Sequence, residues 1–525
     1  MIKNILIFLI IFSPILTYSQ EGTLKWGEYS KIKGYTFDIL PTIENEFYTL
    51  QERKKFIFTS YHLNKFVNFQ TINQGKIQRK IGNSLAKIVA VTTINNLPAV
   101  FLSDYFNGKN ILYLQQYSSN CKPFGPAIEL LAYNLPKTWG IKGEFSLLFS
   151  ENKKFFCVEY DIPGKSNTNE HFGYKIFNSE LKIQKEGNYR LPYTKNEAVI
   201  DSRLLTNIGD YFITTKIFNP EENRSFWSNE EKLNKIVCHQ ISNDTIIPFE
   251  INVENKRIIG LKIGTNENEV LSIGGLYSDE GSKSNGVKGF FYTRINYKSK
   301  QIIDKGQSDF GYDFITKNWT ERAKKRAAQR MEQGKETPEL YDYKLKNTYT
   351  LKDSSIIGLI EQYYVETITY TDPRTGYVSM RYLYHYNDII AFKITKNNTF
   401  EWIHTIPKQQ VSTNDQGYFS SFFSILTDST IQLFFNDEDI HYDENGKWQK
   451  QQDQGLNFNF RRTRNILAKV NLELSSGAVS REKFYTSKEK NTLAVPRLFT
   501  NNPLKHEVIL YLRFGWKEKF GILNY

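Results

Sequence analysis

The residues with the clearest chemical potential lie in one short acidic stretch. The sequence NDEDIHYDENGKW places five carboxylates and one imidazole within eight residues. Carboxylate oxygens are the ligands that Ca²⁺ prefers, but an EF-hand loop needs a glycine at its sixth position and a glutamate at its twelfth. Counted from Asp439, the glycine stands eighth and no glutamate stands twelfth, so we predict a solvated acidic loop and no metal site. The acidic and imidazole residues are Asp437, Glu438, Asp439, His441, Asp443 and Glu444.

The rest of the chain contains no recognisable catalytic motif. Its seven histidines include no HExxH and no pair at helical spacing, which argues against a zinc hydrolase. The patterns GxSxG, GxxxxGK[ST] and GxGxxG are absent, and we predict no cofactor. Acid and base pairs of Asp and Glu from distant segments stay open, because only folding brings such residues together. The catalytic residues, if any, are therefore unknown from the sequence.

Short apolar runs recur along the chain and indicate the elements that position these side chains. Each run but the last is followed by a tight polar turn and another strand, and most are preceded by two strands of their own. Four strands per unit is the blade of a β-propeller. We predict an all-β, eight-bladed propeller, with seven blades as the alternative if residues 311–408 are divided differently. The runs begin at Lys54, Lys109, His171, Lys232, Gly286, Asn387, Arg464 and Lys517.

The two ends of the chain complement each other. The last unit ends at Tyr525 before a fourth strand, while LKWGEYSKIKG offers an unassigned strand before the first unit. We expect residues 24–31 to pair with residues 517–525, which would close the ring and remove an exposed sheet edge. The aromatic content of 15% fits blades that are buried on both faces.

One segment departs from the strand pattern. NWTERAKKRAAQRMEQGKE, from Asn318 to a stop at Gly334, predicts a helical insertion. Asn318 and Glu321 form a capping box, and apolar residues recur every four positions from Trp319. Its many basic residues predict a solvated face more readily than a site for an acidic partner.

The first residues predict export. A lysine, a short apolar core and then polar residues follow one another in MIKNILIFLIIFSPILTYSQ, as in a signal peptide cleaved after Ser19. We therefore expect residues 1–19 to be removed and residues 20–525 to form a single propeller domain in the periplasm or outside the cell. No later window is apolar enough to span a membrane.

Charge and cysteine content exclude some partners. The formal net charge of +12 is spread along the chain, whereas a nucleic-acid binder gathers its basic residues on one stripe. We expect no nucleic-acid partner and a monomer. The three cysteines, Cys121, Cys157 and Cys238, lie far apart, and the last two fall in apolar runs. Buried free thiols are the expected state.

Three segments resemble one group of proteins. They are Gly274–Ile295, Glu361–Asp372 and NDIIAFKITKNNTFEWIHTIPKQQVSTNDQGYFSSF, from Asn387 to Phe422. They are similar to uncharacterised secreted proteins of Bacteroidetes such as flavobacteria. The resemblance implies origin and export, and it carries over no catalytic residue.

The expected function follows from where the loops are long. Connections from the second to the third strand of a blade, and from the fourth strand to the next blade, share one face, which we call the long-loop face. The long segments 163–170, 220–231, 279–285, 367–386 and 437–462 all fall there. Long loops on a rigid scaffold often carry function, so we predict a module that binds a glycan or an envelope protein on this face. The alternative is a carbohydrate-active hydrolase or lyase with its site on the propeller axis. The predicted contacts are Trp227, Arg374, Lys408, Gln409, Tyr442 and Trp448.

Overall fold

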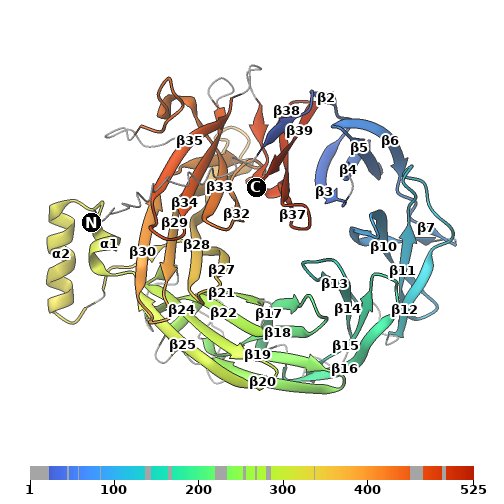
Figure 1. Ribbon diagram of the computed structural model, residues 1–525, viewed down its shortest axis with the longest axis horizontal. Helices are drawn as coiled ribbons and strands as arrows, with labels where there is room; N and C mark the ends of the chain where they lie inside the picture. Colours follow the sequence, from blue (N-terminus) through green and yellow to red (C-terminus); the bar gives the residue numbers. More distant parts are fainter. Residues whose placement is uncertain are drawn as a thin grey trace, which may run out of the picture.

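The computed structural model describes residues 23–525, apart from 44–45, 57, 83, 136–142, 163–167, 195, 219–232, 252, 254–255, 266–268, 280–284, 336, 450–464 and 487–491. In the described part, antiparallel strands form eight sheets of four to six strands and two short pairs. Figure 1 shows the sheets side by side around a common centre, in the manner of propeller blades. The all-β prediction is confirmed. The signal-peptide prediction concerns residues outside the described ones.

Sheets 1 to 4 each consist of four consecutive strands. Sheet 1 contains β3 (Tyr35–Pro41), β4 (Glu46–Lys55), β5 (Phe58–Val67) and β6 (Gln70–Lys76). Sheet 2 contains β9 (Lys87–Ile94), β10 (Leu97–Phe106), β11 (Lys109–Gln116) and β12 (Ile128–Asn134). Sheet 3 contains β13 (Phe145–Phe149), β14 (Phe155–Asp161), β15 (Asn169–Asn178) and β16 (Ile183–Thr194). Sheet 4 contains β17 (Ala198–Leu205), β18 (Tyr211–Phe218), β19 (Leu233–Ser242) and β20 (Thr245–Ile251).

Sheets 5 to 8 include the additions to this pattern. Sheet 5 contains β21 (Lys256–Thr265), β22 (Val270–Asp279), β24 (Gly289–Asn296) and β25 (Gln301–Asp309). Sheet 6 contains β27 (Tyr343–Thr350), β28 (Ile356–Thr371), β29 (Val378–Ile394), β30 (Phe400–Ile406) and β31 (Gln410–Thr413). Sheet 7 contains β32 (Phe423–Leu426), β33 (Thr430–Glu438), β34 (Asn465–Glu473) and β35 (Val479–Tyr485). Sheet 8 contains β36 (Leu493–Ala494), β37 (Thr500–Asn502), β38 (Glu507–Phe514), β39 (Lys517–Asn524), β1 (Leu24–Trp26) and β2 (Ser30–Lys31). The short pairs are β7 (Lys80–Ile81) with β8 (Ser84–Leu85) and β23 (Gly286–Val287) with β26 (Leu340–Tyr341).

The eight apolar runs of the sequence correspond to one position in the sheets. They match β5, β11, β15, β19, β24, β29, β34 and β39, each of which lies between a second strand and an outer strand in its sheet. Residues of these strands are buried against the neighbouring sheets, as Ile236, Val237 and Cys238 show in β19. A strand buried on both faces reads as an unbroken apolar run, which is why these strands are the clearest in the sequence.

The predicted pairing between the two ends of the chain is present. Leu24 of β1 lies opposite Leu523 of β39, and Ser30 of β2 lies opposite Glu518. The N-terminal strand therefore forms the outer strand of sheet 8 in antiparallel register. A contact between two tilted rings continues this pairing, since the centroids of Trp26 and of Tyr485 in sheet 7 lie 4.4 Å apart.

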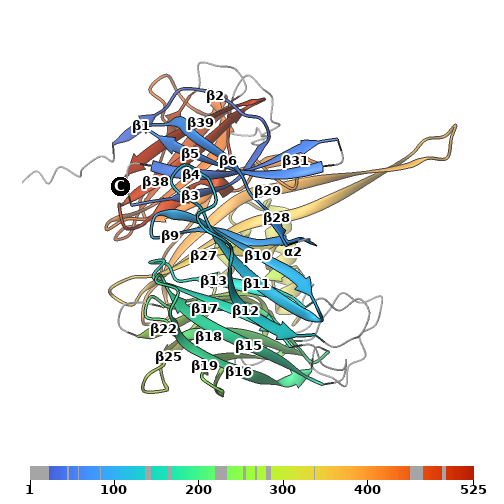
Figure 2. The same cartoon turned by 90° about the vertical axis from the view of Figure 1, so that its right-hand side faces the viewer.

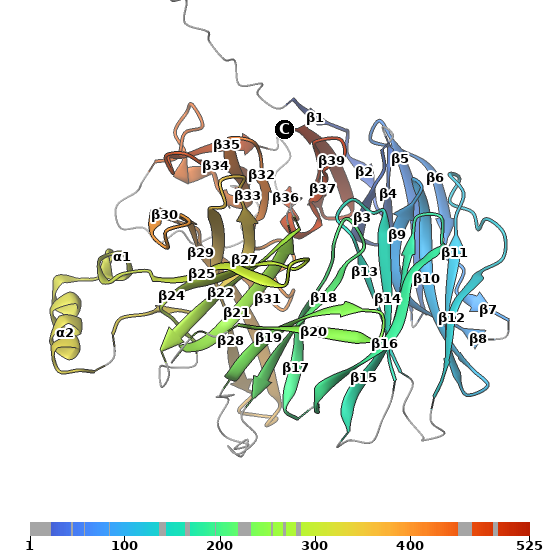
Figure 3. The same cartoon turned by 60° about the horizontal axis from the view of Figure 1, so that its bottom comes forward.

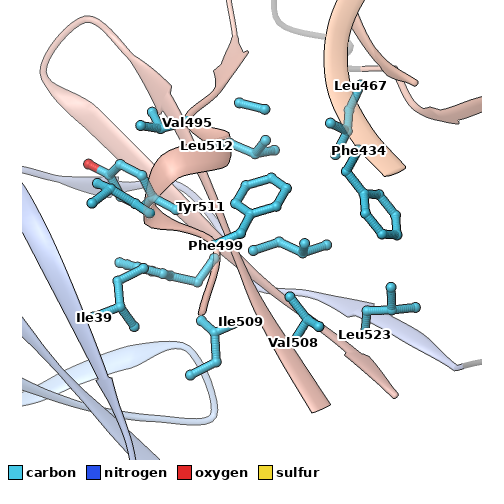
Figure 4. Packing of buried hydrophobic residues seen from close by; sticks show 14 of the residues in the cluster. Ile39, Phe434, Leu467, Val495, Phe499, Val508, Ile509, Tyr511, Leu512 and Leu523 are labelled. Carbon is cyan, nitrogen blue, oxygen red and sulfur yellow. The ribbon is translucent and has the colours of Figure 1, made fainter. Parts of the chain in front are cut away.

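Aromatic and aliphatic side chains fill the spaces between neighbouring sheets. Figure 4 shows one such cluster, in which residues of sheets 1, 7 and 8 converge around Phe499. The rings of Phe47 and Phe66 are stacked 5.0 Å apart, and Phe520 lies within 5 Å of both centroids. Burial of each such side chain contributes roughly 1.5–3 kcal/mol, so these clusters hold sheets 1 and 8 together.

The insertion between sheets 5 and 6 is helical, as predicted, but the predicted helix starts later, at Glu321, and a short helix precedes it. It contains α1 (Tyr312–Thr316) and α2 (Glu321–Glu332), which project from the side of the ring (Figure 3). The predicted cap at Asn318 is wrong, because Thr320 occupies the N-cap position and its hydroxyl accepts a 3.3 Å bond from the Ala323 amide. Ala327 of α2 is buried, and the Tyr312 hydroxyl of α1 donates a 2.8 Å hydrogen bond to the Lys324 carbonyl of α2.

The segment 367–386 was predicted to be a long loop, and this prediction is wrong. Strands β28 and β29 pair from Ile356 through Thr371 and from Val378 onward, so that only residues 372–377 form a turn. Figure 2 shows this hairpin extending far beyond the other sheets; we call residues 363–386 the arm. Threonine, isoleucine, valine and tyrosine alternate along it, and such side chains favour a paired strand even without a core.

Two further expectations concern cysteines and membranes. Cys121, Cys157 and Cys238 are buried free thiols, as expected. Among the described residues, no helix combines the length and the apolar character needed to cross a bilayer.

Candidate ligand-binding cleft

The principal candidate site is a cleft of about 1030 Å³ between sheets 7 and 8. Tyr349 of sheet 6 and Glu151, from the turn between β13 and β14, also reach it. The cleft therefore collects side chains from four sheets. Its rim includes the connections β32–β33 and β37–β38, so it opens opposite the long-loop face. Its other lining residues include Asp428, Gln432, Lys469, Asn471, Glu473, Ser480, Glu482, Asn501, His506, Asn524 and Tyr525.

The cleft forms where one face of sheet 7 changes from apolar to polar side chains along its strands. Towards the long-loop face, Phe434 and Leu467 pack against sheet 8 in the cluster of Figure 4. Two residues further along the same face, the side chains are polar: Gln432 and Lys469 line the cleft. The outer strand that faces them in sheet 8, β1, has only three residues. Its Trp26 ring contacts the Tyr485 ring of sheet 7, whereas no residue of β1 is among those that line the cleft.

The walls carry amide oxygens that no donor satisfies. Gln432 Oε1, Asn471 Oδ1 and Asn524 Oδ1 are shielded from water and have no hydrogen-bond partner in the described part of the chain. A buried polar atom without a partner costs about 1–3 kcal/mol, so nearly all such atoms in native proteins are paired. All three residues line the cleft, so their amides are candidate hydrogen-bonding groups for a ligand.

Two tyrosines provide the aromatic surfaces of the cleft. Tyr525 donates a 2.8 Å hydrogen bond to Asn501 Oδ1, and the Tyr349 hydroxyl lies 2.8 Å from Ser424 Oγ. Burial raises the pKa of both phenols, and the Glu151 carboxylate raises the pKa of Tyr525 further. Both hydroxyls therefore stay protonated at neutral pH and act as hydrogen-bond donors.

The charged residues of the cleft are mostly acidic. Lys469 lies directly opposite Glu482 in the register of β34 and β35, so these two charges neighbour each other. Glu151, Asp428 and Glu473 have no cationic partner among the described residues, and the lining contains no arginine. In the same part of the chain, no group of three His, Cys, Asp or Glu side chains is arranged to hold a metal ion.

Lys408, a predicted contact, is a buried structural residue. Its Nζ lies 3.0 Å from Glu361 Oε1, and it donates a 2.7 Å hydrogen bond to the Tyr386 carbonyl at the base of the arm. Both side chains of the ion pair are almost completely buried. Ser421 donates to the same carboxylate at 2.7 Å, so this network joins the segment after β30 to sheet 6.

Tyr442 and Trp448 belong to a second buried network, centred on Asp437. Arg481 donates to Asp437 Oδ2, the Tyr442 hydroxyl donates to the same oxygen at 2.6 Å, and His441 lies 2.9 Å from Oδ1. The Arg481 guanidinium also lies over the Trp448 ring at 5.1 Å. Burial alone would raise the pKa of Asp437, but the Arg481 charge and these hydrogen bonds lower it to about 2. The prediction of a solvated acidic loop is thus wrong at Asp437.

The other predicted contacts are scattered. Arg374 lies in the turn of the arm, where its amide donates a 2.8 Å bond to Asp372 Oδ1. Gln409 is half-buried in the segment between β30 and β31. Trp227 lies outside the described residues. The structure brings Tyr442 and Trp448 together and leaves Arg374 apart from them.

Sequence reasoning missed every residue of the cleft. The available signal was the alternation in TIQLFFN, where Thr430, Gln432 and Asn436 share one side of the strand with Phe434, and the other side is apolar. Read with Asn471, which lies opposite Gln432 in β34, it marks a polar half-face. Nothing in the sequence showed that Tyr349 and Glu151 meet this half-face.

The comparisons with known proteins concern the fold. No protein-family model matches the chain, and no curated protein matches its sequence. Among solved structures, the Dos1 propeller is similar over 95% of this chain and 94% of its own, with 7% identity and a TM-score of 0.41. The β-propeller domain of Nup133 from Vanderwaltozyma polyspora covers 83% of this chain and 99% of its own, with 12% identity and a TM-score of 0.35. A polysaccharide lyase, an ulvan lyase, covers 80% and 90%, with 9% identity and a TM-score of 0.34.

Proposed function

We propose that this chain is an exported, eight-bladed propeller of the secreted Bacteroidetes type that binds a glycan of the cell envelope through the cleft between sheets 7 and 8. The blade count rests on the eight sheets, and closure rests on the pairing of β1 with β39. The signal-like residues 1–19 support export. Cleavage after Ser19 in the secreted protein would be seen by sequencing its amino terminus.

The observation that carries the glycan proposal is the chemistry of the cleft. A saccharide presents hydroxyl groups around an edge and C–H groups on a face, so its sites combine amide and carboxylate side chains with aromatic rings. The cleft offers unsatisfied amide oxygens and the rings of Tyr349 and Tyr525 within about 1030 Å³. A volume of this size accommodates several sugar units, since pockets for drug-sized ligands measure roughly 300–1,000 Å³.

Titration calorimetry of the purified chain against a panel of oligosaccharides tests the proposal. Tyr349→Ala and Tyr525→Ala should each weaken binding at least roughly tenfold, because each removes one stacking surface and one hydroxyl donor. The matched control is Tyr370→Ala, which removes a 62% exposed ring from the arm. If both cleft variants still bind the oligosaccharide as tightly as the wild type, the binding site lies elsewhere.

A carbohydrate-active hydrolase or lyase is the second candidate, and one observation favours it. Carboxylates from different sheets, Glu151 and Glu473, surround the same cleft together with His506, and such groups can serve as acid and base. Incubation with the bound glycan separates the two functions. A hydrolase releases new reducing ends and a lyase releases unsaturated products, whereas a binding module leaves the glycan intact. If the wild type cleaves the glycan and the Glu473→Gln variant does not, the chain is an enzyme.

A further inference from the structure

The charges of the cleft oppose the charge of the whole chain. The chain carries a formal net charge of +12, yet the cleft holds Glu151, Asp428, Glu473 and Glu482 against the single lysine Lys469. Because Lys469 lies opposite Glu482, the three other carboxylates remain without a cationic neighbour in the described structure. The local potential is therefore negative where the overall potential is positive.

We propose that the cleft selects an amine-bearing saccharide, such as a glucosamine oligomer, over neutral and acidic ones; this inference rests on the proposed glycan-binding function. Recognition of a uronate or sulfate group requires arginine forks or lysines, and the lining contains no arginine. An acidic sugar would bring its carboxylates close to three unpaired carboxylates, whereas an ammonium group would pair with them.

The open hydrogen-bonding groups agree with this selection. The oxygens of Gln432, Asn471 and Asn524 that lack donors accept hydrogen bonds, as do the carboxylates. A ligand that satisfies them must be rich in N–H and O–H donors. An amino sugar supplies both, with three N–H bonds from each ammonium group, while a uronate replaces a hydroxymethyl donor by an acceptor.

Three tetrasaccharides of matched length provide the test: glucosamine, N-acetylglucosamine and galacturonic acid oligomers, titrated calorimetrically at about pH 6, where carboxylates are ionised. The glucosamine oligomer should bind roughly tenfold tighter than the acetylated one, since each exposed ion pair contributes a factor of about 1.4 to 5. The galacturonate should bind most weakly. Raising the salt from about 0.05 M to about 0.5 M should reduce the differences.

The triple variant Glu151→Gln, Asp428→Asn, Glu473→Gln should bring the glucosamine and acetylated oligomers to similar affinity while the acetylated oligomer still binds. These three side chains are exposed, so the fold should tolerate the change. The control Glu129→Gln removes an exposed carboxylate of β12, away from the cleft, and should leave the order unchanged.

Two results would overturn the inference in distinguishable ways. If galacturonate binds as tightly as glucosamine, or the triple variant keeps the full preference, the selection for amines is wrong and the glycan-binding function stands. If none of the three oligomers binds and the wider panel is also negative, the proposed function fails and takes the inference with it.

Discussion

Thr36 Oγ1 donates a 2.8 Å hydrogen bond to Glu518 Oε2 across the seam between sheet 1 and sheet 8. The Gln51 amide donates to the other carboxylate oxygen at 3.2 Å, so Glu518 joins strands from the two ends of the chain. The Glu518 side chain is almost completely buried. Burial raises its pKa from 4.5 to about 7, against the opposing Thr36 hydrogen bond and the charges of Arg513 and Arg53.

Stability should therefore decrease as the pH rises through neutrality. Because the folded pKa of Glu518 lies above the unfolded value, the folded state binds the additional proton between about pH 4.5 and pH 7. The contribution is fully present below the unfolded pKa and is lost as the pH rises through about 7, with a limit of about 3 kcal/mol. Glu518→Gln mimics the protonated form, so urea unfolding of this variant should lack that slope and show higher stability than wild type at about pH 8. An unchanged slope would contradict the assignment.

The Asp437–Arg481 pair should respond in the opposite direction. The folded pKa of Asp437 is about 2, below its ordinary value of 3.8, so its contribution is present above pH 3.8 and disappears as the pH falls towards 2. Arg481→Met should cost about 3–5 kcal/mol, because it leaves a buried carboxylate without its cation. Denaturant unfolding of this variant, with the exposed Arg374→Met as the control, measures the loss. A loss below about 1 kcal/mol would show that the pair is dispensable.

The Lys408–Glu361 pair predicts a non-additive double substitution. Lys408→Met should destabilise by about 3 kcal/mol, at the lower limit for a buried pair, because Lys346 remains 3.3 Å from Glu361. Adding Glu361→Gln removes the unpaired charge, so the double variant should be more stable than Lys408→Met alone. Urea unfolding of the four proteins gives the coupling energy. Additive losses would mean that the two charges do not interact.

The sequence predicts the strands of this fold better than their functional surface. The third strand of each sheet could be predicted because burial on both faces makes it a continuous apolar run, as in β19 and β39. The pairing of residues 24–31 with 517–525 could be predicted because each end lacked the strand that the other supplied. The arm could not, because a two-stranded ribbon without a core shows no apolar face, and Asp372, Pro373 and Gly376 resemble a loop.

The candidate site was unpredictable for a different reason. Lys408 and Tyr442 stand in segments that read as polar loops, but their partners Glu361 and Arg481 are distant in sequence and bury them. The cleft residues are ordinary when read singly. They come together from sheets 7 and 8, from Tyr349 of sheet 6 and from Glu151, and that relation exists only in the folded chain.

The three thiols should be unreactive in the folded protein. Burial raises the pKa of Cys121 to about 12 and raises the pKa of Cys157 and Cys238 as well, and the thiolate is the reactive form. A disulfide reagent should label none of them under native conditions and all three in denaturant. Rapid labelling of a single cysteine would reveal local opening of its sheet.

The arm should be removable without loss of the fold. Replacing residues 368–381 by Asn-Gly joins Thr367 to Tyr382, which already lie opposite each other, through the turn type that such hairpins favour. Tyr382 keeps its 2.9 Å hydrogen bond to Asn414, and among the removed side chains Tyr370 and Tyr377 are more than half exposed. The Tm should therefore change by only a few degrees, and oligosaccharide binding should persist, because the cleft opens at the opposite face. If the full chain captures an envelope protein and the variant without the arm does not, the long-loop face binds a protein partner. A large fall in Tm would show instead that the arm packs against part of the same protein or against a second copy.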